Sequence, residues 1–315
     1  MNRFTKGGPR LRVDVHQHLW PEPLLRALAR RRHAPRLVRD GAGWTLRLRG
    51  EPDAPLVPED HDPDRRAALV EADGLDRALI APSSPLGIEG LPAAEAEPLL
   101  AAYHEGVAAL PERFGAWAAI GLAAPDPAAL SELLDRGLAG ACVPAGALGG
   151  PAGLERLGPV LETLERRGAP LLVHPGPVRA GAPGAPPWWP ALTDYVTEMQ
   201  VAWHAFAVWG RSAHPSLRVC FALLAGLAPL QRERLLARGG LAASDPDVFL
   251  DTSSYGSRAV DAVLREVGVD RLVHGSDRPV APPAELALGP AVDAALRERN
   301  PARLLGVPVA EEIAA

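Results

Sequence analysis

Two histidines near the start of the sequence have the spacing of a metal-binding pair. His16 and His18 lie two residues apart, directly after the apolar start of VDVHQHLWPE. Side chains at positions i and i+2 of a β-strand point to the same side, so both imidazoles can face one ion. Taken alone, the pair is equally compatible with two hydrogen-bonded histidines that bind no metal.

Two later segments carry further ligands of the same kind. The apolar run in APLLVHPGP ends in His174, and DRLVHGSDRP leads into Asp277. If these runs are strands of one closed parallel barrel, their ends meet at one mouth, where three imidazoles and a carboxylate converge. This donor set suits one divalent ion, with Zn²⁺ as the expected metal and Mn²⁺, Fe²⁺ or Co²⁺ as alternatives.

Lysine usage narrows the chemistry further. Lys6, in the N-terminal segment, is the only lysine in the sequence. A Schiff-base lysine, a P-loop lysine or a lysine carbamate that bridges two metals would have to come from the folded body of the chain. None of these three chemistries is therefore expected.

The elements that must position these side chains alternate along the chain. Short runs rich in Val, Ile, Leu and Ala alternate with amphipathic stretches, which is the pattern of βα units and a parallel sheet. The predicted strands are residues 12–16, 77–82, 115–121, 140–145, 170–174, 217–223, 247–252 and 271–275. Eight strands with crossover helices predict an α/β fold, a (β/α)8 TIM barrel, formed as a single domain by residues 1–315.

Two segments interrupt this alternation. Residues 36–49 alternate around DGAG and predict a β-hairpin, inserted at about residues 36–58 after the first helix. Residues 175–190 form a Pro/Gly-rich loop after the fifth strand. Both follow strand or helix ends near the mouth, so we expect lids whose side chains bind substrate, the alternative being surface decoration; the candidates are Trp188, Trp189, Arg47 and Arg179.

Two more polar side chains stand at strand ends. Asp251 closes the seventh predicted strand in VFLDTSS, where it can either act in catalysis or hold neighbouring loops by hydrogen bonds. His274 precedes Asp277 by three residues, an odd offset that points its ring outward toward the helices. We therefore expect His274 to have a structural role.

The charge and composition of the chain limit the kinds of molecule that it is expected to bind. The net charge is −5, and the only basic run is the short stretch at residues 29–36, which argues against nucleic acid and against an anionic membrane surface. No segment approaches the length of a membrane span, and the N-terminus lacks an apolar signal core. Cys142 and Cys220 lie in apolar runs, as reduced core cysteines do. These features predict a cytoplasmic protein with a small-molecule substrate.

The motifs together resemble a known family. From DVHQHLWPE through LLVHP and VFLDTSS to LVHGSDRP and NPARLLG, the chain is similar to the amidohydrolase superfamily, in the amidohydrolase-related branch typified by aminocarboxymuconate semialdehyde decarboxylase. The resemblance covers nearly the whole length. It implies that His16, His18, His174 and Asp277 bind one divalent metal ion, and it suggests a homodimer.

The sequence departs from this family at the sixth strand. Members of the branch typically read FAHLGG, with a histidine that polarises the substrate or serves as general base, whereas this chain reads FALLAG. Leu223 occupies the histidine position, and Ala225 replaces the first glycine. A leucine cannot accept a proton, and loss of a general acid or base costs about 10² to 10⁴ in rate.

Three functions remain open on the sequence. The first is a metal-dependent hydrolase of a small cyclic or aromatic-acid-like lactone or amide, in which metal-activated water attacks and Asp277 shuttles the proton. The second is a non-oxidative decarboxylase of the same family, a reaction that depends more on the missing histidine. The third is a catalytically impaired homologue that retains its metal or ligand pocket, because the sixth strand carries Leu223.

Overall fold

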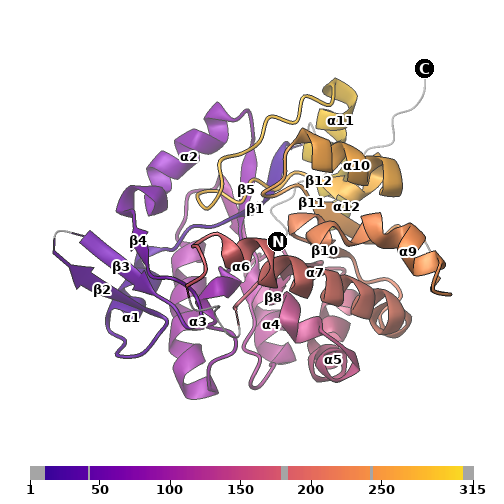
Figure 1. The fold of residues 1–315 in the computed structure, drawn as a ribbon. Helices are drawn as coiled ribbons and strands as arrows, with labels where there is room; N and C mark the ends of the chain where they lie inside the picture. The colour runs from indigo at the N-terminus through magenta and orange to yellow at the C-terminus, as the bar shows by residue number, and fades with distance from the viewer. Residues whose placement is uncertain (1–10, 42, 179–183, 242–243, 308–315) are drawn as a thin grey trace.

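The structure is a barrel of parallel strands surrounded by helices (Figure 1). The computed structural model describes residues 11–41, 43–178, 184–241 and 244–307. One sheet has the order β1-β5-β6 and a second the order β12-β11-β10-β9-β8-β7, with every pairing parallel. The strands are β1 (Val13–Gln17), β5 (Arg77–Ile80), β6 (Phe114–Ala116), β7 (Ala118–Ala119), β8 (Ala141–Pro144), β9 (Leu171–His174), β10 (Val219–Phe221), β11 (Val248–Asp251) and β12 (Leu272–Val273).

Backbone hydrogen bonds join the two sheets at both junctions. At the first, Trp117 lies between β6 and β7 and donates its backbone N–H to Ile80 O at 2.9 Å. At the second, Val15 N donates to His274 O at 2.9 Å, which links β1 to the end of β12. The eight predicted strand positions are all occupied and the TIM-barrel prediction is confirmed, although the third predicted strand is two short strands on either side of Trp117.

Trp117 accounts for that division. Its side chain is fully buried, and its indole Nε1 donates to the backbone oxygen of Val15 at 2.9 Å. A buried indole N–H usually finds an acceptor, and here the acceptor lies on β1 rather than on a neighbouring strand. The residue thus ties the third strand position to the strand that carries the histidine pair.

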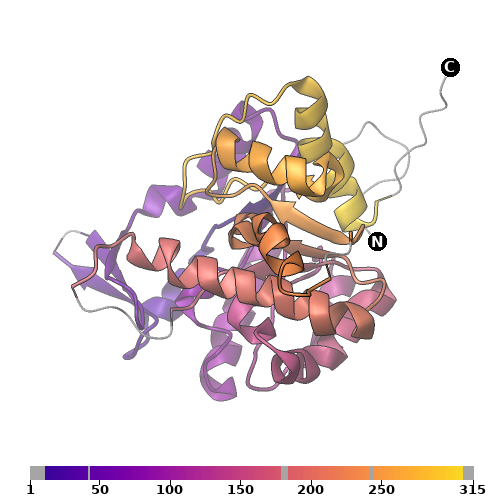
Figure 2. The same cartoon turned by 45° about the vertical axis from the view of Figure 1, so that its right-hand side comes forward.

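Helices cover the outside of the barrel (Figures 1 and 2). Two of the helices begin at aspartate N-caps: Asp62 accepts from Arg65 N, Asp126 accepts from Ala128 N, and each precedes a proline. None of the described helices is long and apolar enough to cross a membrane. The helices are α1 (Glu22–Ala29), α2 (Pro63–Ala72), α3 (Ala93–Ala108), α4 (Pro127–Asp135), α5 (Pro151–Arg167), α6 (Trp189–Leu192), α7 (Asp194–Ala205), α8 (Arg211–Ala213), α9 (Arg232–Leu236), α10 (Ser257–Val267), α11 (Pro290–Ala294) and α12 (Asn300–Leu305).

The predicted insert is present and has one strand more than expected. β2 (Arg36–Asp40), β3 (Gly43–Arg47) and β4 (Ala54–Leu56) form an antiparallel sheet that projects from the barrel beside the start of α6 (Figure 2). A hydrogen bond of 2.7 Å from Tyr195 Oη on α7 to Glu51 Oε1 connects the loop after β3 to the barrel helices. The hairpin prediction is confirmed, and its lid function stays a prediction.

Candidate metal centre

The structure brings the four predicted ligands together. His16 lies in β1 and His18 just after it, His174 ends β9, and Asp277 follows β12. One ligand atom from each residue lies within 4.8 Å of the other three. The Nε2 atom of His18 is 3.1 Å from Nε2 of His16, 3.1 Å from Nε2 of His174 and 3.2 Å from Oδ1 of Asp277. These separations are those of donors that share one ion at about 2 Å each.

The other ring nitrogen of each histidine has its own acceptor. Nδ1 of His16 lies 2.7 Å from Asp251 Oδ2, Nδ1 of His18 lies 3.1 Å from Ala81 O, and Nδ1 of His174 lies 2.8 Å from Pro175 O. Carbonyl and carboxylate oxygens can only accept, so Nδ1 carries the proton in each ring. In the neutral form of each imidazole the lone pair therefore lies on Nε2, as metal ligation requires.

The arrangement of the three imidazole rings is compatible with a bound metal ion. The three rings are mutually near perpendicular, with centroids 4.9 Å apart, and their Nε2 atoms converge on one point. Lone pairs that face one another in a buried site repel unless a cation lies between them. The donor set therefore fits a divalent ion of the zinc or manganese type.

Burial and neighbouring charges act on these groups in different directions. Burial alone lowers the pKa of His16, but the adjacent Asp251 carboxylate outweighs it and raises that pKa to about 9. For His174, burial together with the neighbouring imidazoles outweighs the opposing effect of Asp277 and lowers the pKa well below the usual value. Burial opposes ionisation of Asp277, yet the hydrogen bond and charges of the histidines hold its pKa far below its ordinary range. The cluster thus favours an anionic carboxylate beside the imidazoles.

A buried polar network supports β1 beneath the cluster. Asp14 accepts from His16 N at 3.0 Å and from Gln17 Nε2 at 2.8 Å. Gln17 Oε1 in turn accepts from Arg66 Nη2 at 2.6 Å, and Arg66 Nη1 donates to His18 O at 2.7 Å. Asp14, Gln17 and Arg66 are almost fully buried. The network therefore fixes the backbone that carries both histidines, which matters because small displacements of a ligand weaken metal binding.

Asp251 connects the cluster to the sixth strand position. Its Oδ2 holds Nδ1 of His16, while its Oδ1 accepts from the backbone N–H groups of Leu223 and Ser253 at 3.0 Å each. The carboxylate is fully buried. Of the two roles expected for Asp251, the structure shows the one in which it holds neighbouring groups by hydrogen bonds.

The segment that begins at Leu223 has a left-handed backbone. Residues 223–227 all have positive φ, from 46° to 63°, although only Gly226 lacks a Cβ atom. Left-handed helical conformation costs an L-residue about 1 to 2 kcal/mol, so the surrounding structure must hold this turn in place. Gln200 Nε2 of α7 donates to Gly226 O at 2.7 Å, and a Cβ on Gly226 would lie 2.5 Å from Val196 O. Close packing of α7 is thus one restraint.

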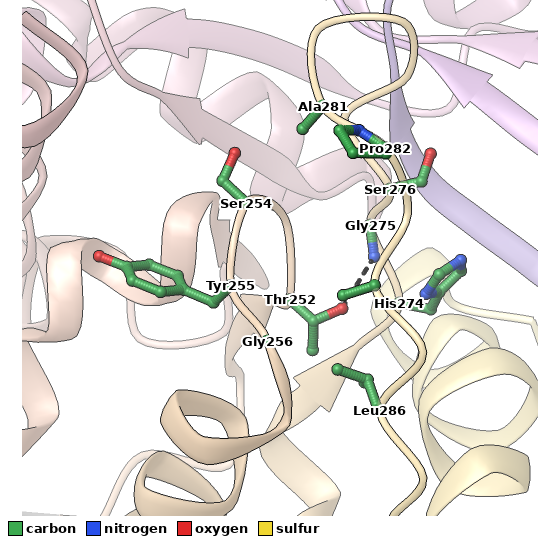
Figure 3. A pocket seen from close by; sticks show the side chains of 11 residues that line it. Thr252, Ser254, Tyr255, Gly256, His274, Gly275, Ser276, Ala281, Pro282 and Leu286 are labelled. Atoms are coloured by element: carbon green, nitrogen blue, oxygen red, sulfur yellow. Dashed lines mark hydrogen bonds between the residues drawn. The ribbon is translucent and has the colours of Figure 1, made fainter. Parts of the chain in front are cut away.

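Asp277 has a second partner on its outer oxygen. Ser254 Oγ donates to Asp277 Oδ2 at 3.0 Å, while Asp277 Oδ1 faces the histidines. Both residues have left-handed backbones, with φ of 62° and 60°. Figure 3 shows Ser254 and His274 on the wall of a cavity of about 200 Å³ beside this contact. His274 is buried with Nε2 3.9 Å from Asp14 Oδ2, and it also lines a second cavity next to α11, as expected for an outward-facing ring.

Comparison with known proteins assigns the family. The family profile described as Amidohydrolase matches residues 13–307. The chain belongs to the amidohydrolase family. A comparison with curated protein sequences gave no match.

Solved structures of similar fold span almost all of this amidohydrolase. The apo form of IDCase from Metarhizium anisopliae has 19% identity and a TM-score of 0.78, with 95% of this chain and 98% of that chain covered. 5-Carboxyvanillate decarboxylase from Novosphingobium aromaticivorans with bound manganese has 16% identity and a TM-score of 0.73, covering 94% and 97%. 2,6-Dihydroxybenzoate decarboxylase from Rhizobium has 17% identity and a TM-score of 0.63, covering 95% and 99%.

The predicted substrate-binding residues of this amidohydrolase are not part of the cluster formed by His16, His18, His174 and Asp277. Trp188 and Trp189 are 56% and 39% exposed, with ring centroids 5.9 Å apart. Arg47 forms an ion pair with Asp53 at 3.3 Å, and Arg179 lies outside the described residues. In the described part of the chain, no hydrogen bond or ion pair joins these side chains to the four-residue cluster. Their role in substrate binding stays a prediction.

Sequence reasoning overlooked one group of residues beside His18. Ser83 Oγ lies 3.1 Å from His18 Nδ1 and accepts from Trp20 Nε1 at 2.7 Å. The Trp20 ring stacks on His61, 4.7 Å away, and His61 Nδ1 accepts from Trp20 N. Burial lowers the pKa of His61 to about 4, so this imidazole is neutral. The only signal in the sequence was the proximity of Trp20 to the histidine pair.

Proposed function

We propose that this amidohydrolase is a metal-dependent, non-oxidative decarboxylase of a small aromatic carboxylic acid. The observation that carries the proposal is the convergence of three Nε2 atoms and Asp277 Oδ1 on one point, with every Nδ1 proton committed elsewhere. Support for decarboxylation comes from full-length structural neighbours that are named carboxyvanillate and dihydroxybenzoate decarboxylases.

One divalent ion would be held by His16, His18, His174 and Asp277. When bound, it supplies a Lewis acid that orients and polarises an oxygen of the substrate. Mn²⁺ is the first ion to test, because a neighbouring structure of this fold has bound manganese. Zn²⁺, which suits the same histidine-rich donor set, is the second.

Asp277 is the group best placed to move a proton in this reaction. Its Oδ2 faces Ser254 at 3.0 Å, away from the histidines, and Ser254 fixes its orientation. In the proposed step the bond between the ring carbon and the carboxyl carbon breaks, its electron pair stays on the ring carbon, and carbon dioxide leaves. Because the histidines hold Asp277 as a carboxylate, its Oδ2 would first take up a proton from solvent and would then deliver that proton to the ring carbon, which returns Asp277 to its anionic form.

Hydrolysis of a lactone or amide is the second candidate, and Leu223 favours it. Asp277 is the only carboxylate among the four donor residues, and its Oδ2 contacts the Ser254 hydroxyl at 3.0 Å. A bound divalent ion would itself lower the pKa of a water molecule to about 7, so hydrolysis would not require a base on strand six. Loss of that histidine therefore weakens decarboxylation more than hydrolysis.

The two candidates are separated by products. We would reconstitute the metal-depleted protein with Mn²⁺ or Zn²⁺ and offer hydroxylated benzoic acids together with aryl lactones and amides. Decarboxylation predicts release of carbon dioxide, with one solvent deuterium on the ring carbon in D₂O. Incorporation of ¹⁸O from water into an acid product, without carbon dioxide, would establish hydrolysis instead. His174→Ala is the matched control for metal dependence.

A further inference from the structure

A small cavity is lined in part by Ser83, whose hydroxyl lies 3.1 Å from Nδ1 of the candidate metal ligand His18. Its volume is about 20 Å³, and its polar lining comes from Trp20, Ser83, Glu89 and Tyr103 among apolar side chains of α1 and α3. A cavity needs about 10 to 15 Å³ to hold one water molecule, and that water needs at least two polar partners. The volume therefore admits one water.

Glu89 brings an unsatisfied atom to this cavity. Its side chain is buried, with 2% of the residue exposed, in the loop between η2 (Ser84–Leu86) and α3. Oε1 accepts a long hydrogen bond of 3.4 Å from Ser84 Oγ, whereas Oε2 has no hydrogen-bond partner among the residues that the structure describes. Buried polar atoms nearly always have a hydrogen-bond partner, so Oε2 requires one that is not a protein group.

Ser83 brings the complementary group. Nδ1 of His18 carries a proton, because it faces Ala81 O at 3.1 Å, so the Ser83 hydroxyl 3.1 Å away cannot donate to it. Ser83 Oγ also accepts from Trp20 Nε1 at 2.7 Å. Both neighbours of the hydroxyl are thus donors, and its own proton needs an acceptor elsewhere.

Within the described residues, no hydrogen bond joins Tyr103, the remaining polar side chain of the cavity, to Ser83 or Glu89. Tyr103 Oη has its hydrogen directed to backbone oxygens, Ile80 O and Trp117 O, each 3.0 Å away. The hydroxyl hydrogen of Ser83 and Oε2 of Glu89 are therefore left without a described partner. Both residues line the same cavity, which is large enough for one water molecule. A water that accepts from the first and donates to the second satisfies both groups.

We infer that one water molecule occupies this cavity between Ser83 Oγ and Glu89 Oε2, and that Glu89 is a positioning residue for the metal ligand His18. The water holds the Ser83 hydroxyl with its lone pairs toward Trp20 and His18. Ser83 then shares the Nδ1 proton of His18 with Ala81 O and restrains the ring. Partners of this kind orient a ligating imidazole and typically change metal affinity about 10- to 100-fold.

The inference rests on the metal-binding part of the proposed function and not on the reaction. Its first test is a high-resolution crystal structure. The expected result is ordered water density within hydrogen-bond distance of both Ser83 Oγ and Glu89 Oε2. A dry cavity, or a direct contact of Glu89 with another protein group, would overturn the inference whether or not the protein decarboxylates anything.

The second test measures Mn²⁺ and Zn²⁺ affinity by chelator competition in variants that remain folded by thermal unfolding. Glu89→Leu removes the acceptor and should weaken binding about tenfold. Glu89→Gln keeps an oxygen for the water and should stay within about twofold. Ser84→Ala is the matched control: it removes the other contact of Glu89 but none of His18, so affinity should not change.

Ser83→Ala approaches the same water from its other end and keeps the test decisive if Glu89→Leu unfolds. It should weaken metal binding by a similar factor, and adding Glu89→Gln or Glu89→Leu to it should cost little more, because the two act through one water. Full additivity of the two effects, or equal loss in Glu89→Gln and Glu89→Leu, would contradict the proposed role. If the variants show the expected changes in metal affinity but the protein turns over its proposed substrates only weakly, the result would count against the proposed reaction and not against the role of Glu89.

Discussion

Strands β9 and β10 are hydrogen-bonded neighbours, with Val173 opposite Phe221, and both lead into the mouth of the barrel. β9 ends in His174, whose Nε2 atom lies 3.1 Å from Nε2 of His18 in the proposed metal site. β10 leads to Leu223, which contributes a backbone N–H to Asp251 and packs its side chain against the core. The end of β9 thus supplies a candidate ligand side chain, whereas the end of β10 supplies only a backbone hydrogen bond and core packing.

The difference shows that a strand end can support the site through its backbone without providing a side chain that binds a metal or moves a proton. The backbone of Leu223 satisfies Asp251, and Asp251 orients His16, so the position still supports the metal site without a protonatable side chain. A histidine at residue 223 would make the same backbone contact. The structure therefore retains the architecture that a strand-six histidine would need.

The largest expected effect comes from the β9 end. His174→Ala removes one of three converging Nε2 atoms, and metal affinity should fall by well over the roughly 100-fold typical of losing an outer partner. Metal content after reconstitution, measured by elemental analysis, checks this. Near-stoichiometric metal in the variant would mean that His174 is not a ligand.

A substitution at the β10 end should raise activity, in contrast to the loss of metal binding expected at the β9 end. Leu223→His restores a protonatable group beside an intact metal site, and kcat should rise by about 10² to 10⁴ if the missing histidine limits the reaction. Leu223→Met is the control for size without proton transfer. High activity of the natural protein with no gain in Leu223→His would rule out the catalytically impaired reading and favour hydrolysis.

Asp251→Asn tests the link between the two strand ends. An amide cannot satisfy His16 Nδ1–H and two backbone N–H groups together as a carboxylate does, so metal affinity should fall about 10- to 100-fold. Competition with a chelator measures the loss. Asp261→Asn, at an exposed ion pair on α10, is a matched control that should leave affinity unchanged.

Gly226→Ala tests the packing that holds the left-handed turn. The new Cβ would lie 2.5 Å from Val196 O, so unfolding free energy should drop by about 3 kcal/mol. Gly239→Ala is the control: this residue also has positive φ, +78°, but has open space around it, and should cost about 1 kcal/mol. Equal losses in chemical denaturation would show that α7 does not restrain the turn.

A pH dependence unrelated to the metal must be separated from these effects. Burial lowers the pKa of His104 to about 4, and its Nε2 accepts from Ala119 N at 3.1 Å. The folded pKa lies below the unfolded value, so stability is fully present above about pH 6.5 and is lost as pH falls toward 4. Between pH 7 and pH 5 the loss should be about 2 kcal/mol. In His104→Gln, which keeps an acceptor, chemical denaturation should show a flatter profile.

The sequence predicted the barrel and the ligand cluster because both depend on simple patterns. Apolar runs with period-two geometry place His16 and His18 on one side, and parallel strands bring their ends to one mouth. Charged networks depend on distant pairings that no local pattern encodes. The link from Gln17 to Arg66 crosses 49 positions, and the pairing of Arg47 with Asp53 follows from a third insert strand that was not expected.

The left-handed turn could not have been predicted at all. Leu, Leu and Ala have no preference for positive φ, and ALLAG is indistinguishable from an ordinary apolar run. The conformation is imposed by Asp251, Ser253 and α7, which come from elsewhere in the sequence. Tertiary contacts therefore override local preference in the segment that contains Leu223 and Ala225.

The handedness of that turn has a stereochemical consequence. Residues 223–227 follow the backbone path that D-amino acids prefer, inside a protein made of L-amino acids. A chemically assembled chain with D-alanine at residue 225 would fit this backbone without conformational strain, whereas the same inversion at Val173 in β9 would oppose its strand. At the four chiral residues of this turn, Leu223, Leu224, Ala225 and Leu227, the mirror-image amino acid is the better match to the backbone.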